Sequence, residues 1–366
     1  VKVNGVPYHG LDIFRNELRL TPRAEGGKTC TIEVESFVYW HGHGGEPNAH
    51  TLEVSELVYV DPEIHAAYWD FRAAVKMFDI NDMTPSFRSF LEKHVWEPLK
   101  SVPVEAPDSE AFKQGLVAAS RQLRESFFAS PRFHKEGLIH MVGHSHLDVV
   151  FLWTHGEYIR KVGRTHATML RLLEQYPQFK FSQSQAKIYA DMKEHYPALF
   201  EQVKARVREG RWEPLGAFWV EPDCNLISGE SFVRQILEGQ RFWEREFGMR
   251  SRICWQPDVF GVSGALPQIL KRSGIDYFMT NKMFVWNDTN PWRKNNFWWE
   301  GPDGSRLLCV VPPGHFIGTV DPDQMNDQWE TVSDKDSVGE SLYCFGWGDG
   351  GGGGSAGAGR QRPPGD

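Results

Sequence analysis

The chain has 366 residues, of which 40% are hydrophobic and 24% are charged, and its formal net charge is −8. A chain of this length can form more than one folded unit. Nucleic acid is not expected as a partner, because the sequence lacks the clustered Lys and Arg that bind phosphates. A membrane is not expected either, because no apolar stretch is long enough to cross one.

The cysteines are five in number and widely spread, with no CxxC pair: Cys30, Cys224, Cys254, Cys309 and Cys344. This spacing favours neither a thiolate zinc site nor a disulfide framework, and it indicates a reducing, cytoplasmic location. The first ten residues lack the pattern of a secretory signal. The sequence does not begin with Met, so we expect a fragment of a longer protein.

Residues 1–61 are predicted to be a small β module, or the last part of one. Residues 29–35 alternate polar and apolar side chains, and residues 51–60 do so in part. Residues 62–130 are predicted to be helical, and residues 109–128 are a second strong helix within them. Apolar side chains recur there at three- and four-residue spacing, as in Tyr68, Phe71, Val75 and Phe78.

Residues 131–354 alternate short apolar runs with amphipathic helices, which is the pattern of a parallel sheet covered by helices. We expect an α/β fold, a (β/α) barrel-like catalytic domain. The predicted strands are 138–142, 179–181, 212–219, 253–256, 276–280 and 342–345. The predicted helices are 157–175, 187–209, 229–247 and 266–273. Residues 355–366 are low in complexity and are predicted to be a disordered tail.

A Gly-His-Ser-His-Leu-Asp sequence at residues 143–148 directly follows a predicted strand. Functional side chains in parallel α/β folds lie at the carboxyl ends of strands, and side chains two apart on an extended segment point the same way. His144, His146 and Asp148 are therefore candidates to face one metal ion, and imidazole with carboxylate suits Zn²⁺. A structural, hydrogen-bonded histidine pair is the alternative.

Further carboxylates follow three other predicted strands. Glu221 and Asp223 lie in Trp-Val-Glu-Pro-Asp, Asp258 lies in Trp-Gln-Pro-Asp, and Asp349 lies in Gly-Trp-Gly-Asp-Gly. Each of them alone also fits a turn or a helix cap. Four strand ends that each supply a carboxylate together favour glycoside hydrolysis, in which one carboxylate attacks the anomeric carbon and another protonates the leaving oxygen.

These motifs together resemble glycoside hydrolase family 38, the zinc α-mannosidases, in its cytosolic and microbial branch. The resemblance covers residues 1–354, including an opening similar to the N-terminal β module of that branch. It implies retaining, zinc-dependent hydrolysis of terminal α-mannosidic bonds in oligosaccharides or glycans. The residues that carry it are 3–10, 144–148, 219–225, 228–230, 233–235, 255–261, 299–306 and 346–353.

The resemblance also implies roles for single residues. His146 and Asp148 would bind Zn²⁺, and Asp223 would be both the nucleophile and a further zinc ligand. Asp349 would be the acid/base. Trp153 would lie near the sugar, and Asp258 is a candidate substrate-binding residue.

The end of the sequence departs from the family pattern. Family members continue the glycine run with Pro-Thr and supply a last zinc ligand from a downstream His-Asp pair, whereas here the run leads into Ser355-Ala-Gly. We therefore expect a C-terminally truncated enzyme with weak or no activity on its own. The alternatives are a non-catalytic mannoside-binding remnant and a metal-dependent polysaccharide deacetylase, which has no reason to carry Trp-Val-Glu-Pro-Asp. The sequence leaves the linkage, the natural glycan and homo-oligomerisation open.

Overall fold

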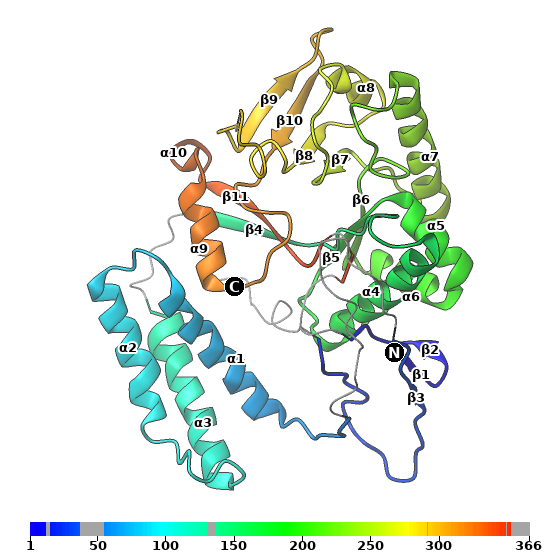
Figure 1. The fold of residues 1–366 in the computed structure, drawn as a ribbon. Helices are drawn as coiled ribbons and strands as arrows, with labels where there is room; N and C mark the ends of the chain where they lie inside the picture. The colour runs from blue at the N-terminus through cyan, green and yellow to red at the C-terminus, as the bar shows by residue number, and fades with distance from the viewer. Residues whose placement is uncertain (12–14, 37–54, 131–136, 291, 349, 353–366) are drawn as a thin grey trace. The chain divides into compact units, whose positions relative to one another are not determined.

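The computed structural model describes residues 1–11, 15–36, 55–130, 137–290, 292–348 and 350–352 (Figure 1). Asp349 and the predicted tail at residues 355–366 lie outside the described residues. The chain divides into two compact units, which are described separately: Val1–His50 with Ile139–Thr319 and Val332–Asp366, and Thr51–Leu138 with Val320–Thr331. Across the described ranges, no helix combines the length and the apolar character needed to cross a membrane.

The second unit is built from helices whose starts are set by side-chain caps. Helices α1 (Pro62–Lys76), α2 (Pro85–Leu99) and α3 (Glu110–Leu123) follow Asp61, Thr84 and Ser109, respectively. Each of these three side chains accepts a hydrogen bond from an N–H group of the first turn, which has no partner inside the helix. The remaining elements of this unit are the 3-10 turn Met77–Asp79, the π-helical turn Arg124–Phe128 and α9 (Pro322–Thr331).

The core of this unit lies between its helices, which Figure 1 shows side by side. Its fully buried apolar side chains come from α1, α2 and α3 and from the turn after α3: Ala74, Leu91, Val95, Leu123 and Phe127. Since each helix buries one apolar stripe, the three-residue and four-residue spacing seen in the sequence is the spacing of this core.

The strand predicted within residues 51–60 is wrong for its described part, residues 55–60. No strand forms there, and Leu57 and Tyr59 are exposed. The alternation of polar and apolar residues breaks at Ser55 and Glu56, which are both polar, and from Leu57 on apolar residues follow one another. No described strand forms a pairing with this segment, and a strand needs such a partner for its backbone hydrogen bonds.

A small antiparallel sheet at the start of the chain belongs to the first unit. It consists of β1 (Lys2–Val3), β2 (Val6–Pro7) and β3 (Ile32–Glu33) in the order β2-β1-β3. The sheet is attached to helix α4 (His155–Gln175): the N–H of Gly10 donates to Thr168 Oγ1 at 2.8 Å, and the Arg171 guanidinium lies 5.0 Å from the ring centre of Tyr8. Of the strand predicted at residues 29–35, only Ile32–Glu33 forms a strand in the structure.

The first unit is a mixed α/β structure, as predicted. Strand β5 pairs in parallel with β6, strand β11 pairs with β4, and the third sheet has the order β7-β8-β10-β9 with β9 antiparallel. These described strands form separate short sheets rather than a closed barrel, so the barrel stays a prediction. The strands are β4 (Leu138–Gly143), β5 (Phe181–Ser184), β6 (Trp212–Leu215), β7 (Ile253–Gln256), β8 (Tyr277–Thr280), β9 (Asn296–Glu300), β10 (Arg306–Val310) and β11 (Glu340–Phe345).

The predicted helices of this unit form, with one of them split, and the short helix α10 (Lys335–Val338) was not predicted. The single helix predicted at residues 187–209 is two helices, α5 (Ala186–His195) and α6 (Pro197–Arg208). Tyr196 separates them with φ −138° and ψ 58°, because a residue before proline is kept out of the helical region. The others are α7 (Gly229–Phe247), α8 (Leu266–Arg272) and α10 (Lys335–Val338).

Strands β7 and β8 are buried on both faces. Cys254 and Phe278 face a cluster that includes side chains of α7 and α8, whereas their neighbours Trp255 and Met279 face a second cluster with Leu215 of β6. Burial on both faces explains why these strands read as continuous apolar runs rather than as alternating patterns. Burial on both faces also fixes the ends of these two strands, and residues that follow these ends belong to the site described below.

Helix α7 packs closely against the segment that leads out of β6. The N–H of Trp219 donates to the carbonyl of Gln235 at 2.9 Å, and the N–H of Val220 donates to the side-chain Oε1 of Gln235 at 3.0 Å. Gly239 lies one turn further on the same helix face. A Cβ at Gly239 would stand 2.3 Å from the carbonyl oxygen of Ala217, so only glycine permits this approach.

We predict that Gly239→Ala lowers the free energy of unfolding by roughly 1–3 kcal/mol, because the added methyl group overlaps backbone that cannot move aside. Urea unfolding followed by far-UV circular dichroism measures this. The control is Gly229→Ala in the same helix, where a Cβ would meet Ile269 Cδ1 at an ordinary 3.8 Å. Equal unfolding midpoints for the two variants would contradict the prediction.

Candidate functional site

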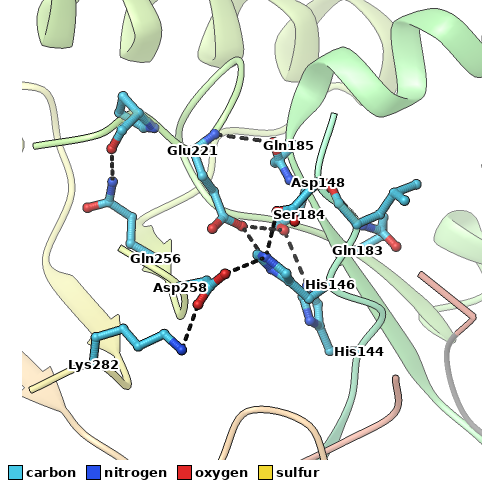
Figure 2. A network of polar contacts seen from close by, with 12 residues as sticks. His144, His146, Asp148, Gln183, Ser184, Gln185, Glu221, Gln256, Asp258 and Lys282 are labelled. Carbon is cyan, nitrogen blue, oxygen red and sulfur yellow. Dashed lines mark hydrogen bonds and ion pairs between the residues drawn. The ribbon is translucent and has the colours of Figure 1, made fainter. Parts of the chain in front are cut away.

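The carboxyl ends of strands β4 to β8 supply polar side chains to one network (Figure 2). Functional side chains gather at such ends because the loops there are free to vary while the strands hold them in place. The residues are His146 and Asp148 after β4, Ser184 and Gln185 at the end of β5, Glu221 after β6, Asp258 after β7 and Lys282 after β8.

The centre of the network is His146, which is 2% exposed. Its Nε2 atom lies 3.1 Å from Asp148 Oδ1 and 3.6 Å from Asp258 Oδ2. One donor atom from each of these three residues falls within 4.8 Å of the others. One imidazole nitrogen and two carboxylate oxygens fit a divalent ion such as Zn²⁺. The structure thus brings together His146 and Asp148 as expected, and it adds Asp258, which the sequence had suggested for substrate binding.

Asp223 does not belong to this three-residue group. It is exposed, and its Oδ1 accepts hydrogen bonds from the backbone N–H groups of Asn225 at 2.7 Å and Leu226 at 3.1 Å. Glu221, two residues earlier, points to the network instead, with Oε1 3.7 Å from His146 Nδ1. The role of Asp223 as nucleophile and ligand stays a prediction.

His144 does not belong to the three-residue group but contacts residues next to it. Its Nε2 lies 3.2 Å from Ser184 Oγ, and its ring packs 5.2 Å from the ring of Trp255. Burial and the neighbouring His146 hold the pKa of His144 well below its usual value, so this imidazole is neutral. The motif alone had offered His144 and His146 alike, whereas the family resemblance implied His146, and in the structure the two differ in their contacts and in the direction of their pKa shifts.

The carboxylates around His146 control its protonation. Burial alone lowers the pKa of His146, but Glu221, Asp148 and Asp258 outweigh burial and hold this pKa well above its usual value. Burial raises the pKa of Glu221 to about 7. Burial also raises the pKa of Asp258, but His146 and Lys282 outweigh it and keep this pKa below the usual value. Negative charge at the site therefore attracts a cation, which can be a proton or a metal ion.

Lys282 is a buried cation at the edge of the group. Its Nζ lies 2.7 Å from Asp258 Oδ1 and 3.9 Å from the ring centre of Trp286, with Phe316 at 5.2 Å. An ammonium held between a carboxylate and aromatic faces is stabilised without water. No sequence motif indicated Lys282, because its partners come from three separate segments.

Ser184 and Gln185 were also missed from the sequence, although a signal was present. The polar run Ser-Gln-Ser-Gln at residues 182–185 continues directly from the short apolar strand predicted at residues 179–181. All four of these polar residues are buried. Polar residues in a buried position need partners, and such a run at a strand end therefore marks a hydrogen-bonded site.

Of the remaining predicted site residues, Trp153 is described by the structure and Asp349 is not. The Lys161 ammonium lies 4.2 Å from the ring centre of Trp153, and burial lowers the pKa of Lys161 to about 8. Asp349 is outside the described residues, but the glycines after it lie beside the first motif. Gly351 donates its N–H to the carbonyl of His146 at 3.0 Å, and Gly350 forms an antiparallel bridge with Leu147.

Comparisons with known proteins place this site in a family. Residues 136–358 match the glycosyl hydrolases family 38 N-terminal domain. Alpha-mannosidase G of Dictyostelium discoideum is 40% identical over 95% of this chain and 33% of its own length. Human alpha-mannosidase 2C1 is 40% identical over 66% of this chain and 23% of its own length. The chain thus spans a third or less of these relatives.

A solved structure supports the fold. The crystal structure of an alpha-mannosidase from Enterococcus faecalis V583 matches 59% of this chain and 25% of its own, with a TM-score of 0.51 and 23% identity. The sequence matches reach further, since the family domain covers more than half of the chain and a 40% identical relative covers almost all of it. The chain therefore belongs to glycosyl hydrolase family 38.

Proposed function

We propose that the protein hydrolyses terminal α-mannosidic bonds of oligosaccharides or glycans, with retention of configuration and with a bound Zn²⁺ ion. The observation that carries the proposal is the group of His146, Asp148 and Asp258 at adjoining strand ends, in a chain of family 38. The relatives compared above are named alpha-mannosidases. A cytoplasmic place of action belongs to the proposal and fits the unpaired cysteines, four of which are buried.

His146 and Asp148 hold the ion in this proposal, with Asp258 as the third donor of the described group and Asp223 as the ligand that the family resemblance adds. When bound, Zn²⁺ supplies a positive charge that the 2- and 3-hydroxyls of mannose can contact. One feature of the site fits this metal: the mixed nitrogen and oxygen donors of His146, Asp148 and Asp258.

The reaction itself is carried by carboxylates. Asp223 attacks the anomeric carbon and forms a glycosyl ester, while Asp349 protonates the leaving oxygen. Asp349 then removes a proton from the water that hydrolyses the ester, so that configuration is retained. The backbone N–H groups of Asn225 and Leu226 hold Oδ1 of Asp223 and so limit the rotation of the nucleophile. Trp153 offers an apolar ring to the sugar.

We expect the protein to release the chromophore from an aryl α-mannoside, at the low rate expected from the sequence, and not from the matching aryl β-mannoside. Chelation should abolish this release and added Zn²⁺ should restore it, because the donor group needs its ion. The measurement is the initial rate with each substrate before chelation, after chelation and after Zn²⁺ addition. Release that persists unchanged in chelator would contradict the metal part of the proposal.

Asp223→Asn is expected to lower kcat by at least about 1000-fold, because the amide cannot form the glycosyl ester. Mannoside binding, measured by calorimetry on the same variant, should change far less. The control is Asp288→Asn, which changes a carboxylate outside the network. A wild-type chain that binds mannoside without turnover, and an Asp223→Asn variant that binds it equally, would favour the non-catalytic alternative instead.

Zn²⁺ binding is expected to strengthen as pH rises. The raised pKa of His146 means that the metal-free site holds a proton at neutral pH, which the ion must displace. The affinity should therefore rise up to about tenfold per pH unit until pH passes that raised pKa. Calorimetry in two buffers of different ionisation enthalpy counts the released protons. An affinity that stays constant between about pH 6 and pH 8, close to the usual histidine pKa, would contradict this.

A further inference from the structure

Glu221 is the carboxylate of the network to which neither the family resemblance nor the donor group gives a role. Its carboxylate lies near a different ring nitrogen of His146 from the one that the two candidate ligands approach. Asp148 and Asp258 approach Nε2 of His146, whereas Glu221 Oε1 lies 3.7 Å from Nδ1. Different carboxylates therefore lie next to each of the two ring nitrogens.

The side chain of Glu221 is held in this position by the end of β5. The hydroxyl of Ser184 donates a hydrogen bond to Glu221 Oε1 at 3.1 Å. The same hydroxyl lies 3.2 Å from Nε2 of His144, so that the three side chains hold one another in place. A carboxylate fixed at one oxygen by a buried donor keeps its other contacts in a narrow range of directions.

The backbone of Glu221 is held by the neighbouring residue. Gln185 accepts a hydrogen bond from the N–H of Glu221 at 3.2 Å and donates one to the carbonyl of Leu147 at 3.0 Å. One amide thus joins the loop that carries Glu221 to the loop that carries His146. Gln185 has φ 69°, a conformation that L-residues other than glycine rarely adopt. Such backbone strain persists where the surrounding contacts require it, and it is often found at functional sites.

A histidine that binds a metal through one nitrogen carries its proton on the other. That N–H normally donates to a carboxylate or a carbonyl, which fixes the ring and increases the basicity of the ligating nitrogen. Nδ1 of His146 is buried and has no hydrogen bond in the described residues, and Glu221 is the carboxylate at ion-pair distance from it. Nε2 faces the other two donors of the group.

We propose that Glu221, held by Ser184 and Gln185, is a positioning residue that fixes the proton of His146 on Nδ1 and so presents the lone pair of Nε2 to the metal ion. This inference rests on the proposed metal function of the site. It differs from a role as a fourth ligand, because Glu221 faces the nitrogen that points away from Asp148 and Asp258 and does not belong to the group whose donor atoms lie within 4.8 Å of one another.

The experiment is a Zn²⁺ titration against a chromophoric chelator, at one pH, with the wild type, Glu221→Gln and Ser184→Ala. Glu221→Gln keeps the shape of the side chain and removes its charge. We expect it to weaken Zn²⁺ binding about 10- to 100-fold, which is the usual loss for a partner of a ligating histidine. Ser184→Ala should weaken binding in the same direction by a smaller factor.

A double variant separates this role from a general effect on folding. If Ser184 acts on the metal through Glu221, adding Ser184→Ala to Glu221→Gln should cause little further loss. The control for charge is Glu213→Gln on β6, where the carboxylate meets the Ser182 hydroxyl at 3.5 Å and not the imidazole. This control should keep the wild-type affinity.

A spectroscopic readout reports the proton directly. In the Zn²⁺-loaded protein labelled with ¹⁵N-histidine, the ring N–H signal that appears on loading should be exchange-protected in the wild type and exchange rapidly in Glu221→Gln. Wild-type affinity and an unchanged N–H signal in Glu221→Gln would overturn the inference and leave the proposed function intact. A wild type that binds no Zn²⁺ would overturn the proposed function itself.

Discussion

A buried imidazole among carboxylates is the constraint on which the rest of the site depends. His146 cannot be solvated, so its charge and its tautomer are set by the groups around it: Glu221, Asp148 and Asp258. These three carboxylates follow three different strands. The loops that carry them must stay in place to keep the charge and the tautomer of His146 unchanged. The close packing of the strands beneath serves this need.

The strands hold the loops because they are buried on both faces. Trp255 and Met279 lie under the network, in the same cluster as Leu215, and Phe316 of that cluster packs 4.9 Å from the ring of His146. On the other face, α7 is fixed against residues 217–219 through Gly239 and Gln235. Because this packing holds the segment that leads to Glu221, a change that loosens it is also expected to alter the geometry of the site.

Much of this architecture could be predicted from the sequence, because short apolar runs and amphipathic periods are local signals. The strand at residues 253–256 and the helix at residues 229–247 were predicted with the bounds that the structure has. The break at Tyr196 was missed, although Pro197 disfavours a helical conformation of the residue before it. The apolar period continues across the break and therefore suggested a single helix. The closure of the strands is a long-range property that no local pattern carries, and the barrel stays a prediction for this reason.

The site was predicted as far as its motifs reach. His146 and Asp148 lie two residues apart after a strand, and this spacing can be recognised from the sequence alone. Asp258 was found as a carboxylate but received a different role, because only the folded chain shows that it faces Nε2 of His146. Ser184 and Lys282 act through partners far away in the sequence, so their contribution depends on tertiary contacts alone.

The ammonium of Lys282 has a consequence for which ions the network can hold. Its Nζ pairs with Oδ1 of Asp258 at 2.7 Å, whereas Oδ2 of the same carboxylate faces Nε2 of His146 at 3.6 Å. Asp258 can therefore offer only one oxygen to an ion as long as this ion pair is in place. Calcium sites commonly take both oxygens of a carboxylate, so the ion pair disfavours a large cation that needs bidentate carboxylates.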